Sequence, residues 1–296
     1  MLTQKLNFWS EDFRWLNNLL RNSIIARCKL KVSKWRSTVK SYIENFKKYR
    51  FLLWELVKKG VKLKYRRSYL GILWTLLEPL MTMIVLSVVF GTLFGNKDPH
   101  FPVYILCGRL MYSFFSSATN GAMKAIRTNA GMIKKVYVPK YIYPLSSVLF
   151  NYIIFAISLI VLVVVSIVLK VYPTVYLAQA IIPLILLLIT AFGVGMILST
   201  MAVFFRDLEY LWSVGLMIIM YASAIFYKPE KLLKSGFGWI LKCNPLYLLI
   251  HNFRQAVFGM PMNMKFLAAS IVFAIVSVIV GLIFFYKKQD EFILHI

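Results

Sequence analysis

Six long apolar stretches, separated by short segments that carry charges, prolines or glycines, dominate the pattern of the chain. A helix that crosses a bilayer needs about 20 mostly apolar residues, and each stretch approaches or exceeds that length. Hydrocarbon offers no partner for unpaired backbone groups, so such stretches are expected to be helices. The uncharged run over residues 171–205 is too short for two spans and a turn, and we count it once. The expected spans cover residues 70–95, 101–123, 145–169, 177–205, 211–227 and 266–286.

The chain before the first span is amphipathic. Apolar residues recur at helical spacing over residues 9–24 and again over residues 35–46, which predicts two basic helices on the membrane surface. A third expected helix, over residues 50–67, places aromatic and aliphatic residues on one stripe and Lys, Arg and Glu on another. It is typical of an interfacial helix held by anionic headgroups. Alternatively, all three helices only anchor the chain.

The segment over residues 228–265, between the fifth and sixth spans, contains prolines and glycines yet is too apolar for a solvated loop. Short external re-entrant or interfacial helices fit it better. The pattern therefore predicts an all-α membrane protein with six transmembrane helices, interfacial helices before them and short external helices between the last two. It divides the chain into a basic surface region (1–49), an interfacial helix (50–69), a transmembrane domain (70–286) and a tail (287–296).

Composition agrees with a membrane protein, and charge gives its orientation. The chain of 296 residues is 60% hydrophobic and has a net charge of +24, with a mean hydropathy of +0.71. That charge suggests nucleic acid, but 18 of the 35 Lys and Arg residues precede Leu70. With the N-terminus inside, cytoplasmic segments hold 26 of them and external segments eight, as the positive-inside rule expects. We therefore predict a multi-pass protein with both termini cytoplasmic and no nucleic-acid partner.

Two charges interrupt the expected spans, Glu78 in the first and Arg109 in the second. A charge at the centre of a bilayer costs about 2.5–3.5 kcal/mol even on insertion scales, so each should face protein or water. These residues are candidates for lining a pathway. Glu78 could instead brace the kink at Pro79, and Arg109 could extend toward the external surface.

Aromatic residues are frequent on three of the spans. Their rings can stack on the C–H faces of sugars without trapping them, which suits a pathway for a glycan. The alternative is that they form core or interfacial belts. Together with the two charges, the candidate channel-lining residues are Glu78, Phe90, Arg109, Tyr112, Phe114, Phe115, Tyr221 and Phe226.

Two turns are expected on the cytoplasmic side. Residues 127–144 form a cationic elbow with several tyrosines and a short helix bounded by Asn129 and two prolines. The elbow either serves only to orient the chain or forms a docking surface. Residues 204–209 form a tight turn in which Arg206 can pair with Asp207 or with a helix end.

The chain lacks the motifs of an enzyme or an ATPase. No phosphate-binding loop or H-E-x-x-H motif occurs, and the three histidines are isolated. Cys28, Cys107 and Cys243 are scattered, which suggests neither a disulfide framework nor a metal site. We expect no catalytic residue, metal or cofactor on this chain, and an energised transporter would need another subunit.

Four ordered blocks resemble the membrane-spanning permeases of ABC-2 type polysaccharide exporters, which include O-antigen and teichoic-acid transporters. They are YRRSYLGILWTLLEPL at residues 65–80, NAGMIKKVYVPK at 129–140, FFRD at 204–207 with AIFY at 224–227, and the segment from NPLY at 244–247 to Arg254. Two features depart from the family pattern. The family usually has an apolar residue at the position of Arg109, and an arginine there would fit an anionic substrate. The segment over residues 1–49 is longer than the corresponding segment of short exporters.

The resemblance implies a homodimer in a bacterial cytoplasmic membrane, with two cytosolic ABC ATPase subunits that bind ATP and Mg. It also implies a substrate glycan linked to a polyprenyl phosphate or pyrophosphate, which passes through an aromatic channel between protomers. The residues expected to contact the ATPase are Asn129, Met132, Ile133, Lys134, Lys135 and Tyr137. Those expected at the lateral opening, near the lipid phosphates, are Lys58, Lys59, Lys62, Arg66, Arg67, Leu70 and Gly71.

Three other functions are considered. A secondary transporter or channel working alone would be expected to carry ionisable residues on several spans. A membrane-embedded transferase would need carboxylates able to act as a base. The third is an ABC-2 exporter of a non-glycan amphipathic substrate.

Overall fold

The computed structural model describes most of the chain after the basic N-terminal region. The described residues are 47–66, 68–93, 98–136, 138–172, 174–230, 236 and 238–295. The two helices expected within residues 1–49 lie almost wholly outside this part of the chain, and Arg67 and Tyr137 lie outside it too. Residues 53–296 form one compact unit, which contains all the long helices of the described chain.

The described residues are helical throughout, with no strand among them. The long helices are α2 (Trp74–Leu93), α3 (Phe101–Thr128), α5 (Ile142–Val168), α6 (Ile181–Phe204), α7 (Leu208–Tyr221) and α11 (Met264–Lys288). Four helical stretches are long and apolar enough to cross a membrane: Gly71–Thr92, Ile142–Val168, Val175–Phe204 and Met264–His295. The expected all-α, multi-pass class is confirmed.

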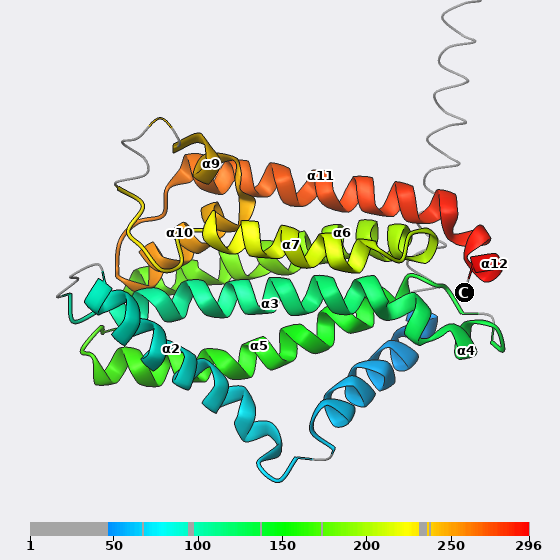
Figure 1. The fold of residues 1–296 in the computed structure, drawn as a ribbon, viewed down its shortest axis with the longest axis horizontal. Helices are drawn as coiled ribbons and strands as arrows, with labels where there is room; N and C mark the ends of the chain where they lie inside the picture. Colours follow the sequence, from blue (N-terminus) through cyan, green and yellow to red (C-terminus); the bar gives the residue numbers. More distant parts are fainter. Residues whose placement is uncertain are drawn as a thin grey trace, which may run out of the picture. The chain divides into compact units, whose positions relative to one another are not determined.

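Helices α3, α5, α6 and α11 run side by side (Figure 1). Small residues allow the close contact between α6 and α11: a Cβ on Gly281 would lie only 2.6 Å from the Gly193 carbonyl oxygen. Lipid tails are as apolar as Leu, so close packing of small residues is a main source of helix association in membranes. The pair therefore provides a rigid side to the bundle.

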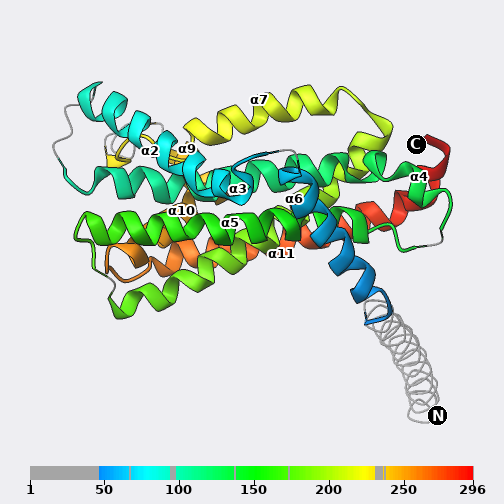
Figure 2. The same ribbon diagram turned by 90° about the horizontal axis from the view of Figure 1, so that it is seen from below.

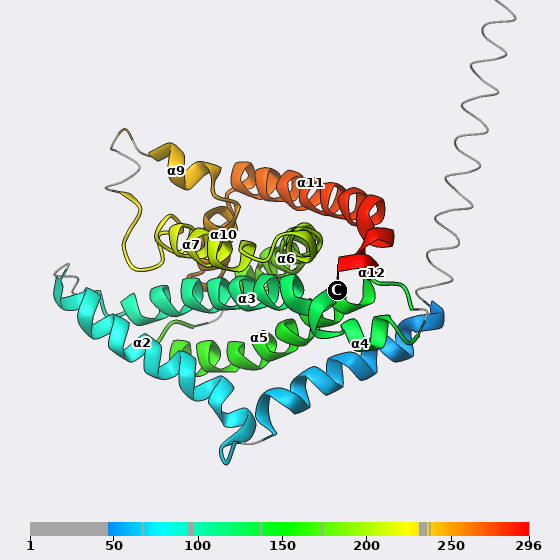
Figure 3. The same ribbon diagram turned by 45° about the vertical axis from the view of Figure 1, so that its right-hand side comes forward.

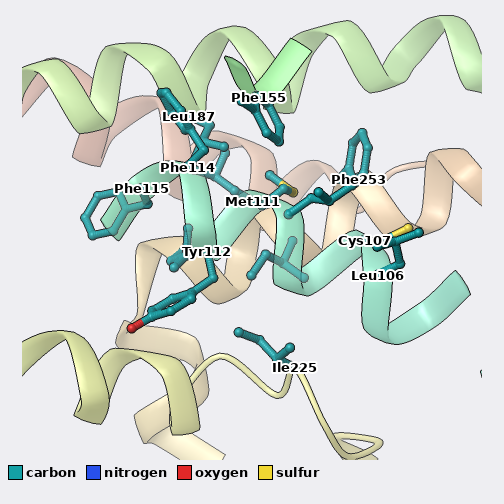
Figure 4. Close-up of a cluster of buried hydrophobic side chains, with 14 of the residues drawn as sticks. Leu106, Cys107, Met111, Tyr112, Phe114, Phe115, Phe155, Leu187, Ile225 and Phe253 are labelled. Atoms are coloured by element: carbon teal, nitrogen blue, oxygen red, sulfur yellow. The ribbon is translucent and has the colours of Figure 1, made fainter. Parts of the chain in front are cut away.

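Helix α3 occupies the centre of the bundle. Its apolar side chains, including Leu106, Met111 and Phe114, are almost fully buried and pack against Phe155 of α5 and Leu187 of α6 (Figure 4). Helix α7 lies on the side of α3 away from α5 (Figure 2). Residues on α3 therefore meet α2, α4, α5, α6, α7 and α10.

The fifth expected span, residues 211–227, is wrong as a continuous helix. Helix α7 ends at Tyr221 after 14 residues, which is about 21 Å at 1.5 Å per residue and shorter than the ~30 Å hydrocarbon core. Residues 222–227 are irregular, and Ala224 has a φ of +48°. Carbonyls freed by this break must find partners elsewhere in the protein.

Two short helices follow, α9 (Gly238–Cys243) and α10 (Pro245–Val257), where short helices were expected. Asn244 begins α10: its side chain accepts a hydrogen bond from the Leu246 N–H at 3.0 Å and donates to the Ala222 carbonyl at 3.1 Å. Helix α10 is buried along most of its length, in contact with α3, α6 and α11. It therefore lies among the other helices of the bundle.

The segment before the first span forms a hairpin with α2 (Figure 3). The helix over residues 53–65 passes α5 closely enough that a Cβ on Gly60 would lie 3.0 Å from the Phe150 ring. The chain turns back through residues 68–70 and the 3-10 helix Gly71–Leu73. The Ser158 hydroxyl then bonds the Thr75 carbonyl at 3.1 Å. Ser158 lies 16 residues into α5, about 24 Å from its start, so the hairpin climbs alongside α5 from its cytoplasmic end.

The contact between Ser158 and Thr75 compensates for Pro79, which lies inside α2. Proline has no N–H, so the carbonyl four residues earlier, at Thr75, loses its helical partner. The Ser158 hydroxyl supplies a donor, although it also bonds the Ile154 carbonyl at 3.0 Å. The kink is thus braced by α5, and Glu78 is not needed for that role.

Ser158→Ala should lower the free energy of unfolding by about 1 kcal/mol, because the Thr75 carbonyl would be left without a donor in the membrane. Thermal unfolding of the purified protein in detergent measures the change. Ser166→Ala is the control on the same helix, since the Ser166 hydroxyl bonds no other helix among the described residues. Equal behaviour of the two variants would contradict the bracing role.

Candidate functional site

A polar pocket lies where the hairpin meets α3 and α5. Its volume is about 140 Å³. Two of its lining charges are the residues that interrupt the expected spans, Glu78 and Arg109. The polar side chains that line it are Lys64, Tyr65, Thr75, Glu78, Thr82, Arg109, Ser113, Ser117, Asn151 and Ser158, and the apolar ones include Trp74, Phe114 and Phe155.

Arg109 and Glu78 share the pocket without an ion pair to each other or to any other described residue. Arg109 instead lies with its guanidinium carbon 5.8 Å from the centre of the Tyr112 ring. The Tyr112 hydroxyl points away toward α7 (Figure 4) and donates to the Leu216 carbonyl at 3.0 Å. Both charges thus line one polar pocket, Glu78 as an exposed residue and Arg109 as a half-buried one, and a charge in a membrane is expected to face protein or water.

A cationic groove runs beside the pocket, between the helix over residues 53–65 and Ile153 of α5. It brings together four of the residues expected near the lipid phosphates, Lys58, Lys59, Lys62 and Arg66. Lys58 pairs with Glu55 at 2.9 Å, and the other three have no acidic partner among the described residues. Leu70 and Gly71 do not line this groove; they form the turn into α2, where Gly71 has a φ of +49°.

Most of the aromatic candidates are buried inside the single chain. Tyr112, Phe115 and Phe226 are each less than 8% exposed, and Phe115 packs against Trp212 of α7. Phe226 stacks on Phe90 of α2 with ring centres 5.0 Å apart. These rings join α2, α3 and the segment after α7. Phe114 alone of the aromatic candidates also lines the pocket, and Tyr221 is exposed.

The elbow over residues 127–144 contains a short helix, α4 (Ala130–Ile133), as expected. Asn129 joins it to α3, with its side-chain amide donating to the Ala125 carbonyl at 2.8 Å. Ile133 does not face outward: it is 8% exposed and packs in a cluster with Tyr143 and Phe285. Met132, Lys134 and Lys135 are exposed and form the free face of the elbow.

Charged contacts hold the end of α3 next to the elbow to the start of α7. Glu209 at the start of α7 pairs with Lys124 at 3.0 Å and with Arg127, both on the last turns of α3. The pair of Arg206 with Asp207, one of the two possibilities that the sequence offered, does not form among the described residues; the acid near this turn that forms ion pairs is Glu209, with Lys124 and Arg127. The elbow and α7 are thereby linked through α3. Partial burial lowers the pKa of Lys140, whose ammonium donates to the Gln289 carbonyl after α11.

At the opposite end of α3, Asp98 before the helix pairs with Lys228 after α7 at 3.2 Å. Partial burial on its own would raise the pKa of Asp98, but hydrogen bonds from the His100 N–H and the Lys228 ammonium outweigh it and lower that pKa. The carboxylate therefore stays charged, and the ion pair persists, at the pH of most environments.

Arg254 on α10 is a structural residue that the sequence pattern did not single out. Its guanidinium donates to the carbonyls of Ala224 at 2.9 Å, Ile225 at 3.2 Å and Tyr104 at 3.1 Å. It also lies 3.5 Å from the centre of the Tyr104 ring. Gly108 leaves it room, because a Cβ there would lie 2.6 Å from the guanidinium. An arginine in a helix without any acidic residue or second Lys or Arg was the available signal.

Comparison with known proteins assigns this arrangement to a family. The model of the ABC-2 type transporter family matches residues 52–258. The chain belongs to this family. It is 30% identical to an O-antigen export system permease protein, RfbA, of Klebsiella pneumoniae over 243 residues, which cover 81% of this chain and 93% of the relative.

Two further relatives have related names. An O-antigen export system permease protein, RfbA, of Myxococcus xanthus is 30% identical over 213 residues, 71% of this chain and 81% of the relative. The polysialic acid transport protein KpsM of Escherichia coli is 24% identical over 245 residues, 80% of this chain and 92% of the relative. The part matched by the ABC-2 family model contains the groove, the pocket, the elbow and Arg254.

Arg254→Lys should destabilise this ABC-2 family protein on the order of 3 kcal/mol, because one ammonium cannot reproduce the planar fork that bonds three carbonyls. Thermal unfolding in detergent is the measurement. Arg206→Lys, at an exposed arginine of the turn before α7, should change stability little. Wild-type stability of the Arg254→Lys protein would show that residues 222–227 are held by other contacts.

Proposed function

We propose that the chain is the permease subunit of an ATP-driven exporter that moves a surface polysaccharide across the membrane. The observation that carries the proposal is the similarity to O-antigen export permeases over 93% of their length. The absence of a phosphate-binding loop from the sequence agrees with a division of labour in which a separate ATPase subunit binds ATP and Mg. Secondary transport and transferase activity lose support once the family is established.

The proposed complex contains two copies of this chain and two cytosolic ATPase subunits, in a bacterial cytoplasmic membrane. Together with the four candidate spans, helices α3 and α7 would give six crossings per protomer. Helix α10 would be a re-entrant helix near the external side. Both termini would be cytoplasmic, which places the cationic elbow on the side of the ATPase. The charge bias between the two sides supports this orientation.

The cationic groove supports a lipid-linked substrate. Lys59, Lys62 and Arg66 lie together beside the apolar side chains of Val57, Val61 and Ile153. A polyprenyl phosphate or pyrophosphate combines a strong anion with a long apolar chain, and it matches both parts of this surface. Teichoic-acid and O-antigen carriers share this chemistry. A non-glycan amphipathic substrate would have no use for the hydroxyl-lined pocket next to the groove.

The elbow is the proposed contact with the ATPase. Met132, Lys134 and Lys135 are exposed on α4 and the turn after it, while Ile133 packs beneath them. A displacement of the elbow by the ATPase would be transmitted to α7 through α3, because Lys124 and Arg127 of α3 pair with Glu209 of α7. Tyr112 then links α3 to α7 a second time, deeper in the bundle.

Met132→Asp combined with Lys134→Glu and Lys135→Glu should abolish copurification of the ATPase subunit and lower export at least about tenfold, since several interface contacts would be reversed. Affinity purification from cells and surface-polysaccharide staining measure the two effects. Lys242→Glu, at an exposed residue of α9, serves as the control. Normal assembly of the triple variant would contradict the docking role of the elbow.

Replacing Lys59, Lys62 and Arg66 by Gln should weaken binding of a polyprenyl pyrophosphate glycan more than about tenfold at low salt, because each cation near a membrane contributes about 1 kcal/mol. Binding to the purified complex in nanodiscs of neutral lipid is the measurement. The matched control removes three other positive charges through Lys170→Gln, Lys242→Gln and Lys265→Gln. Equal affinity of the two triple variants would exclude the groove as the phosphate site.

A further inference from the structure

The polar pocket and the cationic groove are lined by neighbouring residues of the same helix. The groove ends at Lys62, Leu63 and Arg66, and the pocket begins at Lys64 and Tyr65 on the same helix. From there the pocket reaches Arg109, which lies 19 residues before the end of α3, about 28 Å along the helix. A group that enters through the groove would therefore meet the pocket at membrane depth.

The charges of the pocket leave a net positive charge. Lys64 and Arg109 are cationic and Glu78 is anionic, so the formal sum is one positive charge. None of the three has an ion-pair partner among the described residues. The guanidinium of Arg109 is a planar fork that suits two oxygens of one carboxylate or phosphate, and no protein acid in the described structure occupies it.

The other side chains of the pocket suit a hydroxylated ring. Ser113, Ser117 and the carboxylate of Glu78 can accept or exchange hydrogen bonds with hydroxyl groups. Trp74 lines the same pocket and is 49% exposed, which leaves an aromatic face available for C–H stacking. A cavity of about 150 Å³ admits a six-membered ring in another protein, and this pocket has about 140 Å³.

We propose that this pocket binds one negatively charged sugar residue of the glycan in transit and that Arg109 determines the preference for an acidic over a neutral sugar. Arg109 pairs with the carboxylate or phosphodiester of the sugar, Glu78 accepts hydrogen bonds from its hydroxyls, and Trp74 stacks on its ring. The inference rests on the proposed polysaccharide export and adds the charge class of the substrate.

An anionic lipid headgroup with hydroxyls shares the chemistry of an acidic sugar, and the hairpin that borders the pocket is surrounded by exposed apolar residues such as Leu73 and Met81. Competition between lipid and sugar for the pocket distinguishes the two ligands. If the pocket belongs to the glycan, phosphatidylglycerol in the bilayer leaves acidic-sugar binding unchanged. Displacement of the sugar by phosphatidylglycerol would assign the pocket to lipid and overturn the proposal.

The test uses the purified complex of permease and ATPase in phosphatidylcholine nanodiscs, with and without phosphatidylglycerol. The probes are a trisaccharide of hexuronic acid and a neutral trisaccharide of glucose, and their dissociation constants are measured by calorimetry or saturation-transfer NMR. The wild-type protein should bind the acidic probe at least about tenfold more tightly than the neutral one. The neutral sugar lacks the carboxylate that would form charge-assisted hydrogen bonds with Arg109.

Arg109→Gln should bring the two dissociation constants together while neutral-sugar binding remains. Arg109→Lys should retain part of the preference, and Arg206→Gln should retain all of it. A variant Arg109→Gln that keeps the full preference, or a wild-type protein without one, would overturn the inference. Unfolding curves that match those of the wild-type protein confirm that the Gln variant is folded.

Failure of the proposed function would have a different signature. If cells that lack this chain still display their surface polysaccharide, the export proposal fails, whereas the preference of the purified complex for acidic sugar is measured independently. If export is lost in those cells but Arg109→Gln leaves both the preference and the exported glycan unchanged, only the inference about Arg109 fails.

Discussion

The bonding of Arg254 to three backbone carbonyls is the interaction on which the end of the bundle around α10 depends. Helix α7 ends after 14 residues, and a broken helix in hydrocarbon exposes carbonyls that cost several kcal/mol each if they remain unpaired. Arg254 donates hydrogen bonds to the carbonyls of Ala224 and Ile225. The Tyr104 hydroxyl lies within hydrogen-bond distance of the carbonyls of Ala224 and Tyr227. One buried cation thereby joins α3, α10 and the segment after α7.

The same constraint acts at the other places where the helices are irregular. Pro79 frees the carbonyl of Thr75, and Ser158 bonds it across from α5. Asn244 pairs with the residues just after α7 and begins α10. Each repair connects two helices that apolar packing alone would hold weakly in lipid. Polar contacts therefore determine which helices are joined at the irregular points, and apolar side chains fill the space between the helices.

This arrangement suits an export permease with a separate motor. Helix α3 carries the elbow at one end, the Tyr104 contact near the other and Arg109 in its first third, and it binds α7 at Glu209 and Leu216. A displacement of the elbow would be transmitted along one helix to the groove-fed pocket and to the external break. The unpaired charges of the pocket are costly in a membrane, and a polar substrate or water would relieve that cost.

The sequence by itself determined the helical membrane class, the positions of five of the six long helices and the short helix of the elbow, because apolar length and charge bias are local properties. Four ordered sequence blocks indicated the family by resemblance. The sequence also identified Glu78 and Arg109 as functional candidates, since charges are rare in such stretches. The end of α7 at Tyr221, the inward side of Ile133, the pairing of Glu209 with Lys124 and Arg127, and the role of Arg254 were decided by the tertiary structure. Each of these depends on partners that are distant in the chain, and no periodicity along the sequence specifies which distant carbonyl or acid a side chain will meet.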